Sequence, residues 1–383
     1  MRGSEKDQKL SLQQISGPWA EIDLGAITRN LSQIRTLTGE RPLMPVIKAN
    51  AYGHGLIEVA RHLEGLSVAG VCVGRLGEAL ALRRNNIRLP VLNLGGISRD
   101  EAAVAVEQGI IQAVFGDEVR DLDREARQAA SRAVVHVKVD TGLGRVGVPY
   151  RGAQAYLRQV ADLRHVQIAG IFTSLTEDPQ FDRIQLERFQ DVWRQAEASG
   201  LSLGLKHAAS SAAILENPEA LLDLARPGIM LFGHYPSRRE YTRRRIDLSP
   251  ALSFKTRGVC IKELAPGASV AYHQGFIADR ALTLVTGGVG YADGYPLDMV
   301  PGGEVLIRGR RHPLVAAVTA NHIYINAGDC RGIDGNDEVV LLGRQGREFL
   351  GVEEWALVTG RSEYQLLTGI SPTVPRYYRS CPT

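Results

Sequence analysis

The sequence predicts an α/β fold, an eight-stranded (β/α) TIM-type barrel followed by a mainly β C-terminal domain. Short runs rich in Val, Ile and Leu alternate with longer amphipathic stretches over the first 232 residues. Continuously apolar strands that alternate with helices are typical of a parallel sheet covered on both faces. Eight such repeats in about 215 residues match the usual size of a closed barrel. A doubly wound open sheet is the alternative, but no Gly-x-Gly-x-x-Gly follows the first strand.

Each expected barrel strand is a short apolar run. The eight runs are Leu43–Ile47, Val68–Val73, Leu89–Leu94, Ile110–Phe115, Ala133–Val139, Val166–Phe172, Leu203–His207 and Met230–Phe232. The helical patterns between them are Leu56–Leu63, Glu78–Arg84, Asp100–Gln108, Val119–Ala130, Ala153–Leu163, Ile184–Ala198 and Ala213–Leu222. Because each helix separates two apolar runs, all eight strands are expected to be parallel.

The periodicity changes near residue 245. Short strand-like runs punctuated by Gly and Pro follow, and only Gly351–Val358 has a helical pattern. The runs are Phe254–Leu264, Ser269–Ala271, Ala281–Val289, Gly303–Ile307, His312–Val318, Ile323–Ile325 and Glu338–Leu342. We therefore expect a polar extension at residues 1–17, a barrel at 18–246 and a β domain at 247–383, with the basic tract Arg238–Arg245 as a solvated linker.

Composition excludes several classes of protein. The chain is 44% hydrophobic and 23% charged, as is usual for a globular protein, and its net charge of +3 is too small to indicate nucleic acid or an anionic membrane as a partner. It has neither an apolar leader nor an apolar run long enough to span a bilayer. The four cysteines have no zinc-binding spacing and fit reduced thiols. A cytoplasmic location is expected.

The stretch from Pro45 to Gly55 is the first candidate for chemistry. An apolar strand ends at Lys48, and a Gly-punctuated turn that contains Tyr52 follows. A lysine at the end of a buried strand costs free energy unless a charge neutralises it or chemistry uses its neutral amine, as in a Schiff base. The alternative is a lysine whose amine extends to solvent beside the turn.

Other polar residues follow later strands at the same end of the predicted barrel, where active sites of this fold lie. They are Lys138–Arg145, Ser174, His207–Ser211 and Arg226–Ile229. Together they predict a cationic, hydroxyl-rich site for a small anion. Hydroxyls, small residues and backbone N–H groups, of the types found at Tyr52, Ser211, Gly228 and Ile229, are what a phosphate group needs.

Four stretches of the sequence, one of them in the predicted β domain, resemble the alanine racemase family, pyridoxal-phosphate enzymes built from a barrel and a β domain. The matching stretches are Val46–Gly55, Lys138–Gly147, Ala225–Gly233 and Val289–Pro296, in the family's order. The likeness extends over residues 18 to about 380.

The resemblance implies pyridoxal 5'-phosphate as the cofactor, held covalently by Lys48, which also serves as one catalytic base. Tyr291 is implied as the opposite base, reaching the barrel of the partner subunit in a head-to-tail homodimer with shared active sites. Tyr52, Ser211, Gly228 and Ile229 would hold the phosphate. A base on each face of a planar carbanion is what racemisation at Cα requires.

Further roles follow from the same resemblance. Arg226 would face the pyridine nitrogen, where an arginine leaves the ring neutral and a weaker electron sink. Arg145 would lie near the ring hydroxyl and the substrate carboxylate, held in place by Lys138, a residue that can be carbamylated in the family. Tyr364 resembles the tyrosine of the substrate pocket and Tyr272 a residue of the access channel.

Five positions depart from the family's pattern. They are Ser174 in place of histidine, Ser210 in place of asparagine, Ala320 and Asn321 in place of Met-Asp, and Thr373 in place of arginine. Serine is neutral and short, so Tyr291 is expected to be a poorer base unless His322 compensates. Ala320 predicts room for a substrate larger than alanine. Asn321 removes a carboxylate, a change that favours an acidic substrate or simply alters hydrogen bonding.

The resemblance, with these departures from it, therefore implies a pyridoxal-phosphate-dependent amino-acid racemase that acts by two-base proton transfer on a small-molecule amino acid larger than alanine. One alternative is other chemistry on the same scaffold, such as transamination, aldol cleavage or epimerisation. A second is a homologue that carries the cofactor without catalysis. All three keep Lys48, and they differ in whether Tyr291 is needed.

Overall fold

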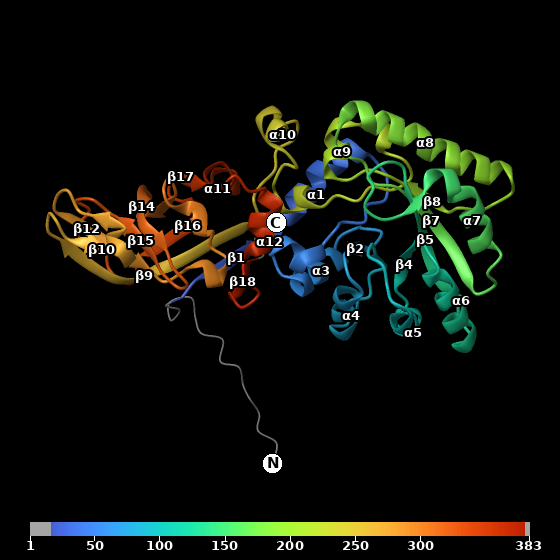
Figure 1. Cartoon of the computed structure of the whole chain (residues 1–383), viewed down its shortest axis with the longest axis horizontal. Helices are drawn as coiled ribbons and strands as arrows, with labels where there is room; N and C mark the ends of the chain where they lie inside the picture. Colours follow the sequence, from blue (N-terminus) through green and yellow to red (C-terminus); the bar gives the residue numbers. More distant parts are fainter. Residues whose placement is uncertain (1–16, 380–383) are drawn as a thin grey trace, which may run out of the picture. The chain divides into compact units, whose positions relative to one another are not determined.

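The computed structural model describes residues 17–379, which form two compact units (Figure 1). The barrel unit comprises Leu24–Ser249. The β unit comprises the described residues up to Asp23 together with those from Pro250 onward. The predicted polar extension, apart from Gly17, lies outside the described residues, as does Cys381. Cys72, Cys260 and Cys330 are free thiols.

Parallel strands form the inner wall of the barrel unit, and helices cover it on the outside (Figure 1). The strands are β2 (Val71–Val73), β3 (Val91–Asn93), β4 (Ile111–Val114), β5 (Ala133–Asp140), β6 (Val148–Pro149), β7 (Val166–Phe172) and β8 (Leu205–His207). They are ordered β2-β3-β4-β5-β7-β8, and the short β6 pairs with β5. Except for β6, each coincides with a predicted strand or lies within it, apart from β5, which runs one residue past its predicted end.

The helices of this unit alternate with its strands, as the sequence predicts. They are α1 (Leu24–Thr38), α2 (Lys48–Tyr52), α3 (Leu56–Glu64), α4 (Leu76–Arg84), α5 (Ala102–Glu107), α6 (Glu118–Gln128), α7 (Ala153–Ala161), α8 (Pro179–Ala198), α9 (Ser211–Glu216) and α10 (Arg238–Arg243). In the longer helices the buried residues are mainly aliphatic and recur at helical spacing, for example Ile27, Leu31 and Ile34 in α1, which is the pattern of a helix with one face packed on the protein.

Residues 43–47 supply the first barrel strand and close the sheet on one side. The Ile47 N–H donates to the carbonyl of Cys72 at 2.9 Å, and the Cys72 N–H donates to that of Pro45 at 2.8 Å. On the opposite edge, the Met44 N–H donates to the carbonyl of Ala225 at 3.0 Å. The predicted first strand is therefore present, although only isolated bridges mark it.

The predicted eighth strand, Met230–Phe232, is wrong. These residues belong to the 3-10 helix η5 (Ile229–Phe232), all buried, and the segment just before them occupies the eighth position. There the Arg226 N–H donates to the carbonyl of Ala209 at 2.9 Å, while the Pro227 carbonyl accepts a hydrogen bond from the first strand. Arg226 and Pro227 disguise this strand in the sequence, because neither residue type is common within strands. Arg226 thus lies in the last strand rather than before it.

The β unit is built on a nine-stranded sheet ordered β17-β16-β13-β14-β15-β12-β9-β1-β18, with a separate β10-β11 pair. A further pairing between β16 and β9 closes six of these strands into a ring. The bounds are β9 (Leu252–Leu264), β10 (Ser269–Val270), β11 (Phe276–Ile277), β12 (Leu282–Gly287), β13 (Glu304–Ile307), β14 (Arg310–Val318), β15 (Ile323–Asn326), β16 (Glu338–Gln345), β17 (Glu348–Leu350) and β18 (Arg376–Arg379). All seven predicted strands are present.

Strand β1 (Trp19–Asp23) belongs to the β unit. It pairs antiparallel with β9, placing Ile22 opposite Leu252, and parallel with β18, placing Ala20 opposite Arg376. Its partners lie more than two hundred residues further along the chain, so no local pattern could reveal the pairing. The two compact units divide after Asp23 and before Pro250.

Two helical segments differ from expectation. Helix α11 (Val352–Thr359) confirms the predicted one, but α12 (Glu363–Gly369) was not predicted. The basic tract expected as a solvated linker contains α10, which begins where the Ser237 hydroxyl accepts a hydrogen bond from the Glu240 N–H. Glu240 is fully buried and forms ion pairs with Arg243 and Arg245, while most of the other residues of the tract are exposed, so the tract is helical and anchored by Glu240 but otherwise solvated as expected.

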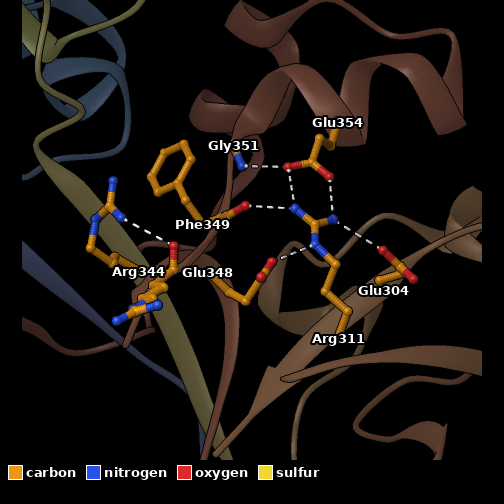
Figure 2. A network of polar contacts seen from close by, with 8 residues as sticks. Glu304, Arg311, Arg344, Glu348, Phe349, Gly351 and Glu354 are labelled. Atoms are coloured by element: carbon orange, nitrogen blue, oxygen red, sulfur yellow. Dashed lines mark hydrogen bonds and ion pairs between the residues drawn. The ribbon is translucent and has the colours of Figure 1, made fainter. Parts of the chain in front are cut away.

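An ion-pair network joins α11 to the β sheet (Figure 2). Arg311 on β14 donates to the carboxylates of Glu304 at 3.0 Å, Glu348 at 3.0 Å and Glu354 at 2.6 Å, and to the Phe349 carbonyl at 2.8 Å. These four partners come from β13, β17 and α11, so one forked guanidinium links three elements.

Among the residues that the structure describes, no helix combines the length and apolarity needed to cross a membrane.

Candidate active site

Lys48 follows the first barrel strand at the carboxyl end of the barrel, and the four residues after it have a backbone conformation that is rare for L residues. Helix α2 is a left-handed turn, with φ between 51° and 55° from Ala49 to Tyr52. Such residues are strained unless the surroundings hold them in place. Here the Asn50 carboxamide oxygen accepts from the Leu56 N–H at 2.9 Å, and Glu78 accepts from the Ala49 N–H at 2.6 Å. The lysine is thus presented by a braced turn.

The amine of Lys48 is placed where its neutral form is favoured. Burial and the nearby Arg145 guanidinium lower its pKa, and Glu78 opposes them. Gly74 gives the side chain room, because a Cβ on this glycine would lie 3.3 Å from the Lys48 Cβ. A neutral, partly desolvated amine is the form that attacks a carbonyl carbon.

A cradle for an anion lies beside this turn. The Ser211 hydroxyl at the start of α9 accepts from the N–H groups of Gly228 at 2.9 Å and Met230 at 3.4 Å, which leaves its own O–H to donate. A Cβ on Gly228 would lie only 2.7 Å from the Tyr52 hydroxyl oxygen, so the glycine keeps this space open. Burial raises the pKa of Tyr52, which therefore stays a protonated donor. These donors and this space fit a phosphate monoester.

Arg226 lies in the barrel interior and orders two histidines. Its guanidinium donates to His207 Nδ1, to the Thr173 carbonyl at 2.9 Å and to the Ala208 carbonyl at 3.3 Å. Burial lowers the pKa of Arg226 to about 10, so it remains charged at neutral pH. Because arginine only donates, His207 carries its proton on Nε2, 2.8 Å from Nδ1 of His136. Burial and Arg226 lower the pKa of His136 to about 4 and that of His207 well below its usual value.

Lys138 and Arg145 add positive charge to the same end of the barrel. Lys138 Nζ donates to the Ser174 hydroxyl at 3.3 Å and lies 5.2 Å from the ring centre of Phe172. Burial, followed by repulsion from Arg226, Arg145 and Lys48, lowers the pKa of Lys138 to about 7. Arg145 is exposed on the loop between β5 and β6. Ser174, where the family has histidine, thus faces a lysine that is partly neutral at pH 7.

The structure therefore gathers one group of predicted site residues and leaves another group elsewhere. Lys48, Tyr52, Lys138, Arg145, Ser211, Arg226, Gly228 and Ile229 all lie at the carboxyl end of the barrel. Tyr291, Tyr364 and Tyr272 belong to the β unit, on η7 (Tyr291–Asp293), α12 and η6 (Tyr272–Gln274). Of these, Tyr291 is 54% exposed and Tyr272 is 79% exposed.

The Tyr291 backbone is held by hydrogen bonds to a turn that contains two of the positions that depart from the family. The N–H groups of Tyr291 and Ala292 donate to the carbonyls of Thr319 and Ala320, each at 3.0 Å. Gly290 allows this contact, since a Cβ there would lie 2.1 Å from the Thr319 oxygen. Ala320 and Asn321 form the tip of a turn between Thr319 and His322. The Thr319 hydroxyl closes this turn, because it donates to the His322 carbonyl and accepts from the His322 N–H.

A third departure lies nearby. The Ser371 N–H donates to the carbonyl of Asp293 at 3.1 Å, and the Ser371 hydroxyl lies 2.7 Å from that of Thr373. The short Thr373 side chain thus bonds within its own turn. Three of the five altered positions are therefore clustered around the Tyr291 segment.

Glu78 and His136 were not assigned to the site from the sequence, and His207 was placed there without a role. Glu78 braces the Lys48 turn and also accepts from the Gly74 N–H at 2.9 Å. His136 and His207 connect to Arg226 inside the barrel. The signal for the histidines was present, because His136 interrupts the apolar strand Ala133–Val139. A polar residue at such a position needs a partner, and this requirement marks it for attention.

The fold and site define an enzyme in which a strand-end lysine and a phosphate-type cradle share the mouth of a parallel barrel. Residues 22–236 match the alanine racemase N-terminal domain, and residues 251–378 match the alanine racemase C-terminal domain. The chain belongs to the alanine racemase family.

Its relatives cover nearly the whole chain. The alanine racemase of Symbiobacterium thermophilum is 37% identical over 365 residues, 94% of this chain and 96% of its own length. The solved alanine racemase of Clostridium difficile 630 has a TM-score of 0.90 at 30% identity, covering 97% of each chain. That of the D-cycloserine-producing Streptomyces lavendulae has a TM-score of 0.91 at 28% identity, covering 96% of this chain and 98% of that one.

Proposed function

We propose that this protein is a pyridoxal-phosphate-dependent amino-acid racemase that moves the Cα proton between two bases, Lys48 and Tyr291. The observation that carries the proposal is the placement of Lys48, whose pKa is lowered by burial and by Arg145, beside the cradle of Tyr52, Ser211 and Gly228. An amine beside a phosphate-type site is what a phosphorylated aldehyde cofactor requires.

The residues of the barrel unit fit this cofactor. Tyr52, Ser211, Gly228 and Ile229 would hold its phosphate, Lys48 would hold its aldehyde carbon and Arg226 would face its ring nitrogen. Tyr364 is proposed as a further binding residue. Pyridoxal phosphate, when bound, supplies an electron sink that acidifies the Cα–H bond of an amino acid. Because Arg226 remains protonated and donates only, it would leave the ring nitrogen of the bound cofactor unprotonated and so moderate that sink.

The two bases act on opposite faces of Cα. The Lys48 amine accepts the proton on one face, and the Tyr291 phenol returns one on the other. Arg145 binds the substrate carboxylate, and the neutral pair of His207 and His136 holds the Arg226 guanidinium in place. Exposure of Tyr291 on the β unit supports its proposed role at the barrel of a partner subunit.

The substrate is proposed to be larger than alanine. Ala320 lies at the tip of the turn that holds the Tyr291 backbone, where the family has a methionine. A methyl side chain there leaves several heavy atoms' worth of space for the substrate's own side chain. Asn321 beside it supplies an amide rather than a carboxylate. We expect Ala320→Met to lower kcat/KM for a large amino acid relative to alanine, with Asn321→Asp as the matched variant of the neighbouring position.

Isotope exchange tests the reaction. The holoenzyme is incubated in heavy water with L- and D-forms of alanine, serine, lysine and glutamate, and Cα deuterium is followed together with optical rotation. Exchange with inversion is expected, and Tyr291→Phe should abolish exchange from one enantiomer only. Exchange with retention would instead indicate a one-base reaction such as transamination. No exchange, with cofactor still bound, would indicate a protein that carries the cofactor without catalysis.

A mixing experiment tests the shared site of the proposed homodimer. Lys48→Ala and Tyr291→Phe proteins are each inactive in racemisation, and they are unfolded and refolded together to form mixed dimers. If Tyr291 serves the partner's barrel, each mixed dimer regains one intact site and activity returns. If both bases come from one chain, every site remains defective and the mixture stays inactive.

A further inference from the structure

One face of α8 contacts two of the loops that carry site residues. Phe181, Gln185 and Arg188 are spaced four and three residues apart, so they lie on the same side of the helix. We call them the α8 face. The helix begins firmly, with the Asp178 carboxylate accepting from the N–H groups of Gln180 and Phe181 and with Pro179 at its first position. It is therefore a rigid support for whatever its face contacts.

The first contact is with residues 141–147, the Arg145 loop. Arg188 donates to the Thr141 carbonyl at 2.8 Å, and its guanidinium lies 4.8 Å from the ring centre of Tyr150 and 5.5 Å from that of Phe181. Gly142 has a φ of 143°, and a Cβ on it would lie 2.7 Å from the Phe181 ring. Phe181 thus packs directly on the backbone of the loop.

The second contact joins this loop to the one after β7. The Gln185 amide donates to the Thr141 hydroxyl and to the Ser174 carbonyl, each at 3.2 Å, and its oxygen accepts from the Thr176 N–H at 2.9 Å. Gln185 is fully buried, and these bonds use both hydrogens and the oxygen of its amide. The Thr141 hydroxyl also lies 2.8 Å from that of Thr173. One side chain therefore sets the spacing between the Arg145 loop and the Ser174 loop.

The far end of the Arg145 loop is fastened to its own strand. The Asp140 carboxylate accepts from the N–H groups of Gly142 at 3.0 Å and Gly144 at 3.1 Å. A Cβ on Gly147 would lie 2.8 Å from the Asp140 nitrogen, so the loop closes tightly at its base. The loop thus has one attachment within itself and one on α8, and Arg145 lies at the tip.

We propose that the α8 face positions Arg145 and thereby sets the affinity of the enzyme for the substrate carboxylate. Arg188 is the principal positioning residue, because it donates to the backbone carbonyl of Thr141, four residues before Arg145. The rings of Tyr150 and Phe181 both contact its guanidinium and hold it in place. Gln185 keeps the Ser174 loop, and with it the hydrogen-bond partner of Lys138, in register with Arg145. This inference rests on the proposed function in one respect, namely that Arg145 binds the carboxylate.

The test is a double-mutant cycle in the holoenzyme. Arg188→Ala is compared with Arg183→Ala, which removes the same side chain from an exposed position on the same helix. With the amino acid that exchanges fastest in the panel above, Arg188→Ala is expected to raise KM on the order of tenfold with little change in kcat. Arg183→Ala should leave both constants unchanged. In an Arg145→Ala background, Arg188→Ala should have no further effect on KM.

Hydrogen–deuterium exchange provides a readout that does not depend on activity. Amides of residues 141–150 are expected to exchange faster in Arg188→Ala than in the parent or in Arg183→Ala, while the thermal midpoints of all three remain close. An equal rise in KM with and without Arg145 would overturn the proposal, as would unchanged exchange in this peptide. If Arg145→Ala itself has a normal KM, the carboxylate role fails instead, and the exchange result still decides whether α8 orders the loop.

Discussion

Replacing Gly228 by alanine should weaken cofactor binding by filling the cradle. The added Cβ would lie 2.7 Å from the hydroxyl oxygen of Tyr52 and 3.4 Å from its Cζ. Contact without repulsion needs about 3.5 Å, so the hydroxyl and the new methyl must separate by roughly 0.8 Å. Tyr52 is buried, and its ring packs 5.4 Å from that of Phe232, so it has little room to withdraw.

The expected loss follows from the cost of overfilling a packed site. Such insertions cost about 1–3 kcal/mol, which corresponds to a dissociation constant roughly 5- to 150-fold higher for pyridoxal phosphate. The assay is a titration of the apoprotein with the cofactor, followed by absorbance. Gly152→Ala is the control, since this glycine lies elsewhere in the barrel unit at φ −97° and its new Cβ would meet nothing within 4 Å.

A second variant separates steric overlap from other effects. In a Tyr52→Phe background the offending oxygen is gone and the nearest remaining atom is Cζ, at 3.4 Å. Gly228→Ala should then cost much less affinity than it does in the parent protein. If it costs the same in both backgrounds, or if Gly228→Ala alone binds the cofactor as tightly as the parent, the account of the cradle is refuted.

Three further predictions concern stability. Lys138 has a pKa of about 7 in the folded protein, below the value near 10.4 of a free lysine. Its buried charge therefore destabilises the apoprotein to the full extent below about pH 7, and this destabilisation decreases as the pH rises toward about 10. Lys138→Met should reduce the rise in urea midpoint between these pH values, and an unchanged slope would contradict the argument. Asn30→Ala removes hydrogen bonds to the Leu231 carbonyl at 3.1 Å and to the backbone carbonyl and N–H of Ser249, each at 2.8 Å. The substitution should lower the free energy of unfolding by roughly 2–4 kcal/mol. A loss within experimental error would show that these bonds contribute nothing. Arg311→Lys replaces the forked guanidinium shown in Figure 2 by a single ammonium group. Because the Arg311 side chain is 33% exposed, the loss of unfolding free energy should stay below about 1 kcal/mol and shrink in 1 M salt. A larger loss that does not depend on salt would be inconsistent with a surface network.

Much of the barrel could be predicted because its strands are continuous apolar runs. The exceptions have physical causes. The eighth strand carries Arg226 and Pro227, which hide it, while the buried run Met230–Phe232 beyond them forms a 3-10 turn instead. Strand β1 pairs with segments too distant in sequence for any local pattern to show.

The site shows the same division. Lys48, Ser211 and Arg226 could be located because they follow or interrupt apolar runs at one end of the barrel. The conformation of the Lys48 turn could not, since Ala49, Asn50 and Ala51 have right-handed preferences and are held left-handed by contacts with Glu78 and with the start of α3. The α8 face also escaped prediction, because its amphipathic spacing is that of any helix packed on a sheet.

The position of β1 has a consequence for the order in which the chain can fold during synthesis. Trp19, fully buried in the finished protein, emerges from the ribosome before every residue of the barrel unit, yet its neighbours on β9 and β18 are made only after that unit is complete. The barrel can therefore fold as soon as residue 249 is available, whereas this first strand waits for β9 to follow it and gains its second neighbour, β18, only when the last part of the chain arrives.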